Sequence, residues 1–139
     1  PPGRYALAEG ESRHIGRLVL PLRVYQALQT ETSLWVNASL EHRVRVILDD
    51  YPARDGLKEA FARPLQALKP KLGGEATDRM LGLLQRGEWE ALTRELMVLY
   101  YDPLYEHTRP ERRIEIDVEP PERGLARLRS AISRVLAEG

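Results

Sequence analysis

The sequence contains no cysteine among its 139 residues. Disulfides, thiolate metal ligands and cysteine nucleophiles are therefore excluded within this chain. No stretch approaches the roughly 18 consecutive apolar residues that a membrane-spanning helix requires. Residues 1–4 have the composition of neither a signal sequence nor a charged leader. We therefore expect a cytoplasmic protein that contacts no membrane.

Charge of either sign is not in excess, because 21 basic residues balance 21 acidic ones. A net charge of zero gives no general attraction to nucleic acid, so any such contact needs a local patch. A phosphate loop of the form Gly-x-x-x-x-Gly-Lys-Ser/Thr is also missing from the sequence. This chain alone is therefore not expected to act as a nucleotide-binding enzyme.

The apolar residues that are present predict an α/β fold within a single domain, residues 1–139. Short strands are expected at residues 5–9, 34–38 and 114–118, which would form a partial parallel sheet of about three strands. Helices are expected to follow each strand, and a helical insertion over residues 55–107 lies between the second and third strands.

Local signals predict where several helices begin and end. Ser39 is expected to cap a helix over residues 41–50, and Thr77 a helix over residues 78–85. The Asp102-Pro103 pair is expected to end a helix that begins at Glu88. In the terminal helix the inward-facing residues are expected to be Leu125, Leu128, Ile132, Val135 and Leu136.

A polar segment follows the first predicted strand and would emerge at the carboxyl end of the sheet, where open α/β sheets bind ligands. Its carboxylates, hydroxyl and guanidinium suit a hydrated metal ion or an anionic oxygen, and its glycines allow close approach. The residues in question are Glu9, Gly10, Glu11, Ser12, Arg13 and Gly16. An ordinary turn with an internal Glu–Arg pair explains the same letters.

Three further groups carry possible chemistry. Arg43, early in a helix after a strand, occupies a place where arginines approach phosphates, although a solvated charge is the commoner case. The tyrosines of residues 100–105 can stack on bases or sit at the edge of the core. Arg123 and Arg127 share a helix face and form a possible RNA-backbone patch, diluted by neighbouring glutamates. The histidines have no metal-ligand spacing, and we predict no metal site.

Four of these segments, in this order, resemble tRNA 2-selenouridine synthases. Residues 9–16, with Leu20-Pro21, are similar to that family's E-x-E-S-R-x-I-G…L-P segment. Residues 41–51 resemble its R…L…(E/D)-(E/D)-Y helix end. Residues 65–73 match its L-x-x-(I/L)-K-x-(R/K)-L-G stretch, and residues 100–105 its Y-Y-D-P-(M/L)-Y signature.

The resemblance implies the C-terminal part of a P-loop domain in a larger parent. Such a parent has an N-terminal rhodanese-like domain with a cysteine, followed by the phosphate loop. It converts wobble 2-thiouridine of tRNA to 2-selenouridine through a geranylated intermediate. The resemblance thus implies tRNA as partner, selenophosphate and geranyl diphosphate as substrates, and compatibility with Mg²⁺. It implies no cofactor for this chain alone, which is expected to be inactive without the missing segments.

The resemblance also implies roles for particular residues. Those expected to face a phosphate-containing ligand or its metal are Glu9, Glu11, Ser12, Arg13, Gly16 and Arg43. Those expected at the tRNA or prenyl site are Tyr51, Lys69, Lys71, Tyr100, Tyr101, Asp102 and Tyr105. The catalytic base is not identified. Two other interpretations fit parts of the pattern: a piece of a P-loop small-molecule kinase, and a non-catalytic RNA or protein interaction domain.

Overall fold

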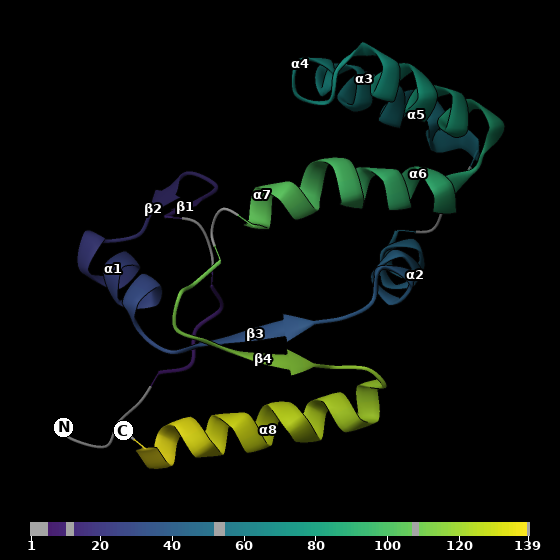
Figure 1. The fold of residues 1–139 in the computed structure, drawn as a ribbon. Helices are drawn as coiled ribbons and strands as arrows, with labels where there is room; N and C mark the ends of the chain where they lie inside the picture. The colour runs from purple at the N-terminus through teal and green to yellow at the C-terminus, as the bar shows by residue number, and fades with distance from the viewer. Residues whose placement is uncertain (1–5, 11–12, 52–54, 107–108, 139) are drawn as a thin grey trace. The chain divides into compact units, whose positions relative to one another are not determined.

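The structure is a computed structural model that describes residues 6–10, 13–51, 55–106 and 109–138 (Figure 1). The chain divides into two compact units. Unit 1 comprises residues 1–38 and 110–139, and unit 2 comprises residues 39–109. The fold is α/β and mostly helical. In the described part of the chain, no helix is both long and apolar enough to cross a membrane.

Unit 1 is built around two parallel strands, β3 (Ser33–Asn37) and β4 (Arg113–Asp117). Both were predicted, and their register pairs Asn37 with Asp117, so the two strands end at the same edge. Helix α8 (Pro121–Glu138) runs alongside β4 (Figure 1). This arrangement confirms the predicted third strand and the terminal helix that follows it.

The sheet is smaller than predicted. The residues from Ala6 to Gly10 form no strand and are exposed, with Leu7 at 77% of its accessible area. An apolar run becomes a strand only when a neighbour pairs with it, and the described part of the chain offers this segment none. The antiparallel hairpin of β1 (His14–Ile15) and β2 (Leu18–Val19) precedes α1 (Leu22–Thr30) instead.

The buried face of α8 differs in part from the prediction. Leu128, Ile132 and Val135 are half-buried, but Leu125 and Leu136 are 53% and 44% exposed. Small residues, Gly124 and Ala131, are buried in their place. A Cβ on Gly124 would lie 2.3 Å from the backbone oxygen of Val118, so only glycine allows the helix to approach the chain this closely.

Unit 2 is helical: its elements, from α2 through α7, lie between β3 and β4 in the sequence. Its core contains Met80, which is fully buried, and the leucines that pack around it. Helices α3 and α5 lie side by side above α6 (Figure 1). The elements are α2 (Leu40–Asp50), η1 (Asp55–Leu57), α3 (Lys58–Ala67), α4 (Lys69–Leu72), α5 (Gly74–Arg86), α6 (Trp89–Leu96), η2 (Met97–Tyr101) and α7 (Asp102–Glu106).

One predicted cap is confirmed and one is wrong. The Ser39 hydroxyl oxygen accepts a hydrogen bond from the His42 amide at 3.1 Å, which caps α2 as predicted. Thr77 lies inside α5, where it is 1% exposed and its hydroxyl donates to the Gly73 carbonyl at 2.8 Å. Helix α5 begins earlier, because Gly73 takes a positive φ of 83° and starts the new helix directly.

The predicted helix end at Asp102-Pro103 is also wrong. Residues Met97–Tyr101 form a π-helical turn, and the Asp102 amide donates to the carbonyl of Met97, five residues earlier. Pro103 then falls in the first turn of α7, where a missing N–H is tolerated. The wider turn also moves the buried face, so that Met97 is buried and Leu99 is 42% exposed.

Candidate functional site

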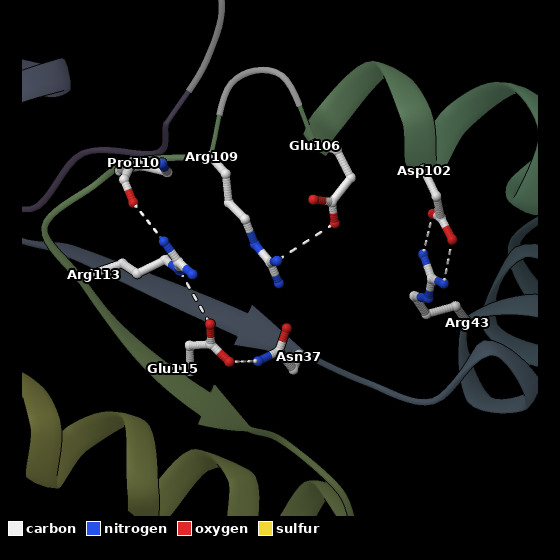
Figure 2. Close-up of polar contacts among 8 residues, drawn as sticks. All are labelled: Asn37, Arg43, Asp102, Glu106, Arg109, Pro110, Arg113 and Glu115. Atoms are coloured by element: carbon white, nitrogen blue, oxygen red, sulfur yellow. Dashed lines mark hydrogen bonds and ion pairs between the residues drawn. The ribbon is translucent and has the colours of Figure 1, made fainter.

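An ion pair in unit 2 joins the two motifs that contain Arg43 and Asp102. Arg43 lies in the first turns of α2, and Asp102 is the first residue of α7. Nη1 and Nη2 of Arg43 donate to Oδ1 and Oδ2 of Asp102 at 2.6 and 2.9 Å (Figure 2). This is a two-point fork between a guanidinium and a carboxylate, the most directional ion pair that proteins form.

The fork is partly sheltered from water and strongly polarised. The two side chains are 34% and 37% exposed. Hydrogen bonds from Arg43 lower the pKa of Asp102 below its ordinary value, and the carboxylate raises the pKa of Arg43 in turn. The Nε atom of Arg43 is buried and has no hydrogen-bond partner among the described residues. Both groups are therefore ionised at neutral pH, and they form a hydrogen-bonded ion pair with each other.

A second ion pair links α2 to α6. Arg94 Nη1 on α6 lies 2.7 Å from Glu41 Oε1 on α2. Val44, the residue after Arg43 in α2, is 2% exposed. Met97, the first residue of η2, is also buried. Helix α2 is thus held by one exposed pair and by the Arg43–Asp102 fork.

The tyrosines of the 100–105 motif divide into two kinds. Tyr100 is half-buried, meets the Tyr101 ring edge-on with centroids 5.1 Å apart, and has Lys71 Nζ 5.3 Å from its ring centroid. Tyr101 and Tyr105 are 47% and 62% exposed. They stand four residues apart on one helix face and define the tyrosine surface, Tyr101 and Tyr105.

The other predicted residues of unit 2 lie apart from the fork in the chain. Tyr51 follows the last residue of α2 and is 73% exposed. Lys69 begins α4, and its side-chain methylene lies beside Gly74. The structure therefore brings Arg43 and Asp102 together, and Lys71 with Tyr100.

In unit 1 the acidic segment does not open from a strand end. Glu9 is exposed, and Glu11 and Ser12 lie outside the described residues. Arg13 directs its Nε to the Leu20 carbonyl at 3.5 Å, across the β1–β2 hairpin that turns at Gly16 with φ 59°. Arg13 and Gly16 thus lie in a hairpin, and their predicted role toward a phosphate-containing ligand stays a prediction.

Strands β3 and β4 carry polar residues, along β4 and at the carboxyl ends of both, that the sequence motifs did not single out. Asn37 Nδ2 donates to Glu115 Oε2 at 3.4 Å, and Arg113 Nε donates to Glu115 Oε1 at 3.0 Å (Figure 2). Asp117 Oδ1 accepts the Glu119 amide at 2.9 Å. The signal for them was the pair of strands itself, since polar residues that end parallel strands meet at one edge.

The proposed RNA patch on α8 is also engaged within the chain. Arg127 Nη1 donates to the carbonyls of Asp117 and Glu119 at 2.9 and 3.2 Å, and it lies 3.6 Å from the Asp117 carboxylate. Arg123 is exposed on the previous turn. Arg127 therefore holds the link between β4 and α8.

Comparison with known proteins decides the family. A sequence model described as the tRNA 2-selenouridine synthase AAA domain matches residues 2–127. The chain belongs to this family. The match covers both units and includes the fork, the tyrosine surface and Arg127.

Curated tRNA 2-selenouridine synthases are similar to the chain at about one residue in three. The protein of Pseudomonas savastanoi pv. phaseolicola is 32% identical over 141 residues, covering 80% of this chain and 37% of its own length. That of Azotobacter vinelandii is 33% identical, covering 79% of this chain and 36% of its own length. The chain thus spans little more than a third of these relatives. No solved structure matches it.

Proposed function

We propose that this family member forms part of an enzyme that converts wobble 2-thiouridine of tRNA to 2-selenouridine through a geranylated intermediate. The observation that carries the proposal is the family match over residues 2–127. The same match favours a synthase over a small-molecule kinase or a non-catalytic interaction domain. Selenophosphate and geranyl diphosphate would be the substrates of the whole enzyme, and a segment outside this chain would supply the cysteine and the phosphate loop.

The part played by this chain would be to contact tRNA and the phosphate-bearing ligand. Exposed aromatic rings stack on unpaired bases irrespective of sequence, and Tyr101 and Tyr105 offer two such rings on one face. Lys69 and Lys71 lie in the short helix α4 of the same unit, as positive charges for an RNA backbone. We also propose that β3 and β4 belong to a larger P-loop-type sheet in the whole enzyme.

Binding of Mg²⁺ would have to involve carboxylates of this chain or of the segments that accompany it. Among the described residues, no group of three or more histidine, aspartate or glutamate side chains could hold a metal ion. In the described part of the acidic segment, Glu9 is the one carboxylate, and it is exposed. No step of the chemistry is assigned to a metal.

A direct test is a fluorescence-anisotropy titration of the chain with two anticodon stem-loops, one with wobble 2-thiouridine and one unmodified, at two salt concentrations. We expect salt-sensitive binding that prefers the thiolated loop. Equal binding to both loops would limit the chain to backbone contacts. Absence of binding to either would refute a tRNA-contacting role for this chain by itself.

Ring stacking is tested by two variants at one position. Tyr101→Leu removes the ring but keeps an apolar side chain, whereas Tyr101→Phe keeps the ring. Because a stacked base is worth about 1–3 kcal/mol, Tyr101→Leu should weaken binding at least about fivefold. Tyr101→Phe should bind within about twofold of the unaltered chain, which corresponds to less than half a kcal/mol. Equal losses in both variants would contradict stacking.

A further inference from the structure

We propose that Arg43 is a positioning residue that holds the tyrosine surface in place, and that it does not bind phosphate itself. The inference rests on the proposed function, because the tyrosine surface matters only if this chain contacts RNA. It changes the role that the family resemblance implies for Arg43. The geometry of its guanidinium carries the argument.

A guanidinium can grip a phosphate with two parallel N–H donors along either of two edges, one formed by Nη1 and Nη2 and the other by Nε and one Nη. Asp102 occupies the first edge, with both of its oxygens at 2.6 and 2.9 Å. The second edge contains Nε, which is buried. Arg43 therefore has no edge left for a two-point grip on a phosphate.

The charge of Arg43 is also neutralised where it lies. The carboxylate of Asp102 is in direct contact with it, and the pKa of Asp102 is lowered, so the carboxylate stays ionised at neutral pH. The pair presents a dipole to its surroundings in place of a positive charge. An incoming phosphate would meet the negative end of that dipole as well as the positive end.

The fork contacts the chain at the junction of the π-helical turn and α7. Asp102 follows the π-helical turn directly, next to Tyr101 and one turn before Tyr105. Its partner extends from α2, beside Val44, which is buried. The hydrogen bonds from Arg43 on α2 fix the rotation of the chain around the helix axis just after the π-helical turn, a rare and short element. That rotation sets where the two exposed tyrosines point.

Asp102→Asn separates the two roles because they predict opposite signs. It removes the carboxylate but leaves the guanidinium charged. If Arg43 bound phosphate, release from Asp102 would tighten binding of the 2-thiouridine stem-loop. If Arg43 positions the tyrosines, both Asp102→Asn and Arg43→Gln weaken that binding, by about fivefold or more. Tighter binding by Asp102→Asn overturns the proposal.

Glu41→Gln is the matched control, because it also removes one negative charge from an ion pair that involves α2. It leaves the fork intact, and binding should stay within about twofold of the unaltered chain. Arg43→Lys adds a further check, since it keeps the charge but cannot form the fork. We expect Arg43→Lys to bind as weakly as Arg43→Gln; binding restored by lysine would favour a phosphate contact and overturn the proposal.

Hydrogen exchange without RNA distinguishes failure of this inference from failure of the proposed function. Amides of residues 97–106 should exchange at least about tenfold faster in Arg43→Gln and Asp102→Asn, but not in Glu41→Gln. Unchanged exchange would refute the positioning role even if RNA binds. Faster exchange in these two variants, together with no stem-loop binding by the unaltered chain, would support the positioning role of Arg43 and refute the RNA-contacting role. If Arg43→Gln fails to fold by circular dichroism, Asp102→Asn decides the question alone.

Discussion

Gly124 offers a sharp test of how α8 packs. A Cβ at this position would lie 2.3 Å from the carbonyl oxygen of Val118 and 2.6 Å from its Cα. Ordinary contacts of a Cβ begin at 3.4 Å. In Gly124→Ala the helix and the end of β4 must therefore move apart by roughly 1 Å. The obstructing atoms belong to the backbone, and no side-chain rotation relieves the contact.

The expected loss follows from two opposing terms. Overpacking of this kind costs about 1–3 kcal/mol. Alanine in a helix returns at most about 1 kcal/mol relative to glycine. Because the clash is with backbone atoms, the cost should lie at about 2–3 kcal/mol, so Gly124→Ala should destabilise unit 1 by about 1–2 kcal/mol. The shift should also strain the hydrogen bonds that Arg127 donates to the carbonyls of Asp117 and Glu119.

Gly82 provides the opposite case in helix α5. A Cβ there would meet only Nη1 of Arg86, at 3.1 Å, which is the movable end of a side chain. With little obstruction, Gly82→Ala should stabilise unit 2 by up to about 1 kcal/mol. The same substitution in two helices is thus expected to have opposite signs.

Urea unfolding measures both effects, and the two tryptophans report on different units. Trp35 lies in β3 of unit 1, and Trp89 begins α6 of unit 2. Gly124→Ala is therefore followed by Trp35 fluorescence in a Trp89→Phe background, and Gly82→Ala by Trp89 fluorescence in a Trp35→Phe background. A Gly124→Ala variant as stable as its parent would refute the close approach of α8 to Val118.

Three further outcomes are expected. Met80→Ala should destabilise unit 2 by about 2–5 kcal/mol in urea unfolding, because Met80 is fully buried; a loss under 1 kcal/mol would place it outside the core. Ser39→Ala should cost about 1 kcal/mol by removing the cap on the His42 amide, while Ser39→Asp should retain most of it. Because Arg43 lowers the pKa of Asp102, the stability from this fork is complete above the unfolded pKa of about 3.9 and lost as pH falls through the lower folded value. Unfolding midpoints between pH 2 and 6 should therefore fall less steeply in Asp102→Asn, and equal slopes would contradict the assignment.

Local signals in the sequence predicted much of the secondary structure. Ser39 was recognised as a cap because its hydroxyl needs only the amide three residues later. Strand β3 was recognised from its short apolar run, and β4 from the alternation of apolar and acidic residues. The cap and the strands depend on residues that are near one another in the chain, so they can be predicted from the sequence.

Other features depend on partners that the sequence does not name. Residues 6–9 resemble a strand, but no strand among the described residues pairs with them. Thr77 resembles a cap, but the positive φ of Gly73 starts its helix earlier. The fork could not be predicted, because Arg43 and Asp102 are 59 residues apart and each has many possible partners. Residue type and motif marked Arg43 and Asp102 as candidate site residues, but only the folded structure shows that they form an ion pair.

The π-helical turn makes residue count as important as residue type. Such a turn holds one residue more than the α-helical turn it replaces, so deleting one of residues 97–99 would restore the α-helix. Everything downstream would then rotate by about 100° around the helix axis. Asp102 would move away from Arg43 although every letter of the Tyr-Tyr-Asp-Pro-Leu-Tyr signature was kept, and the acid-dependent part of the stability would disappear with it. A sequence can therefore carry the whole signature and still lack the fork.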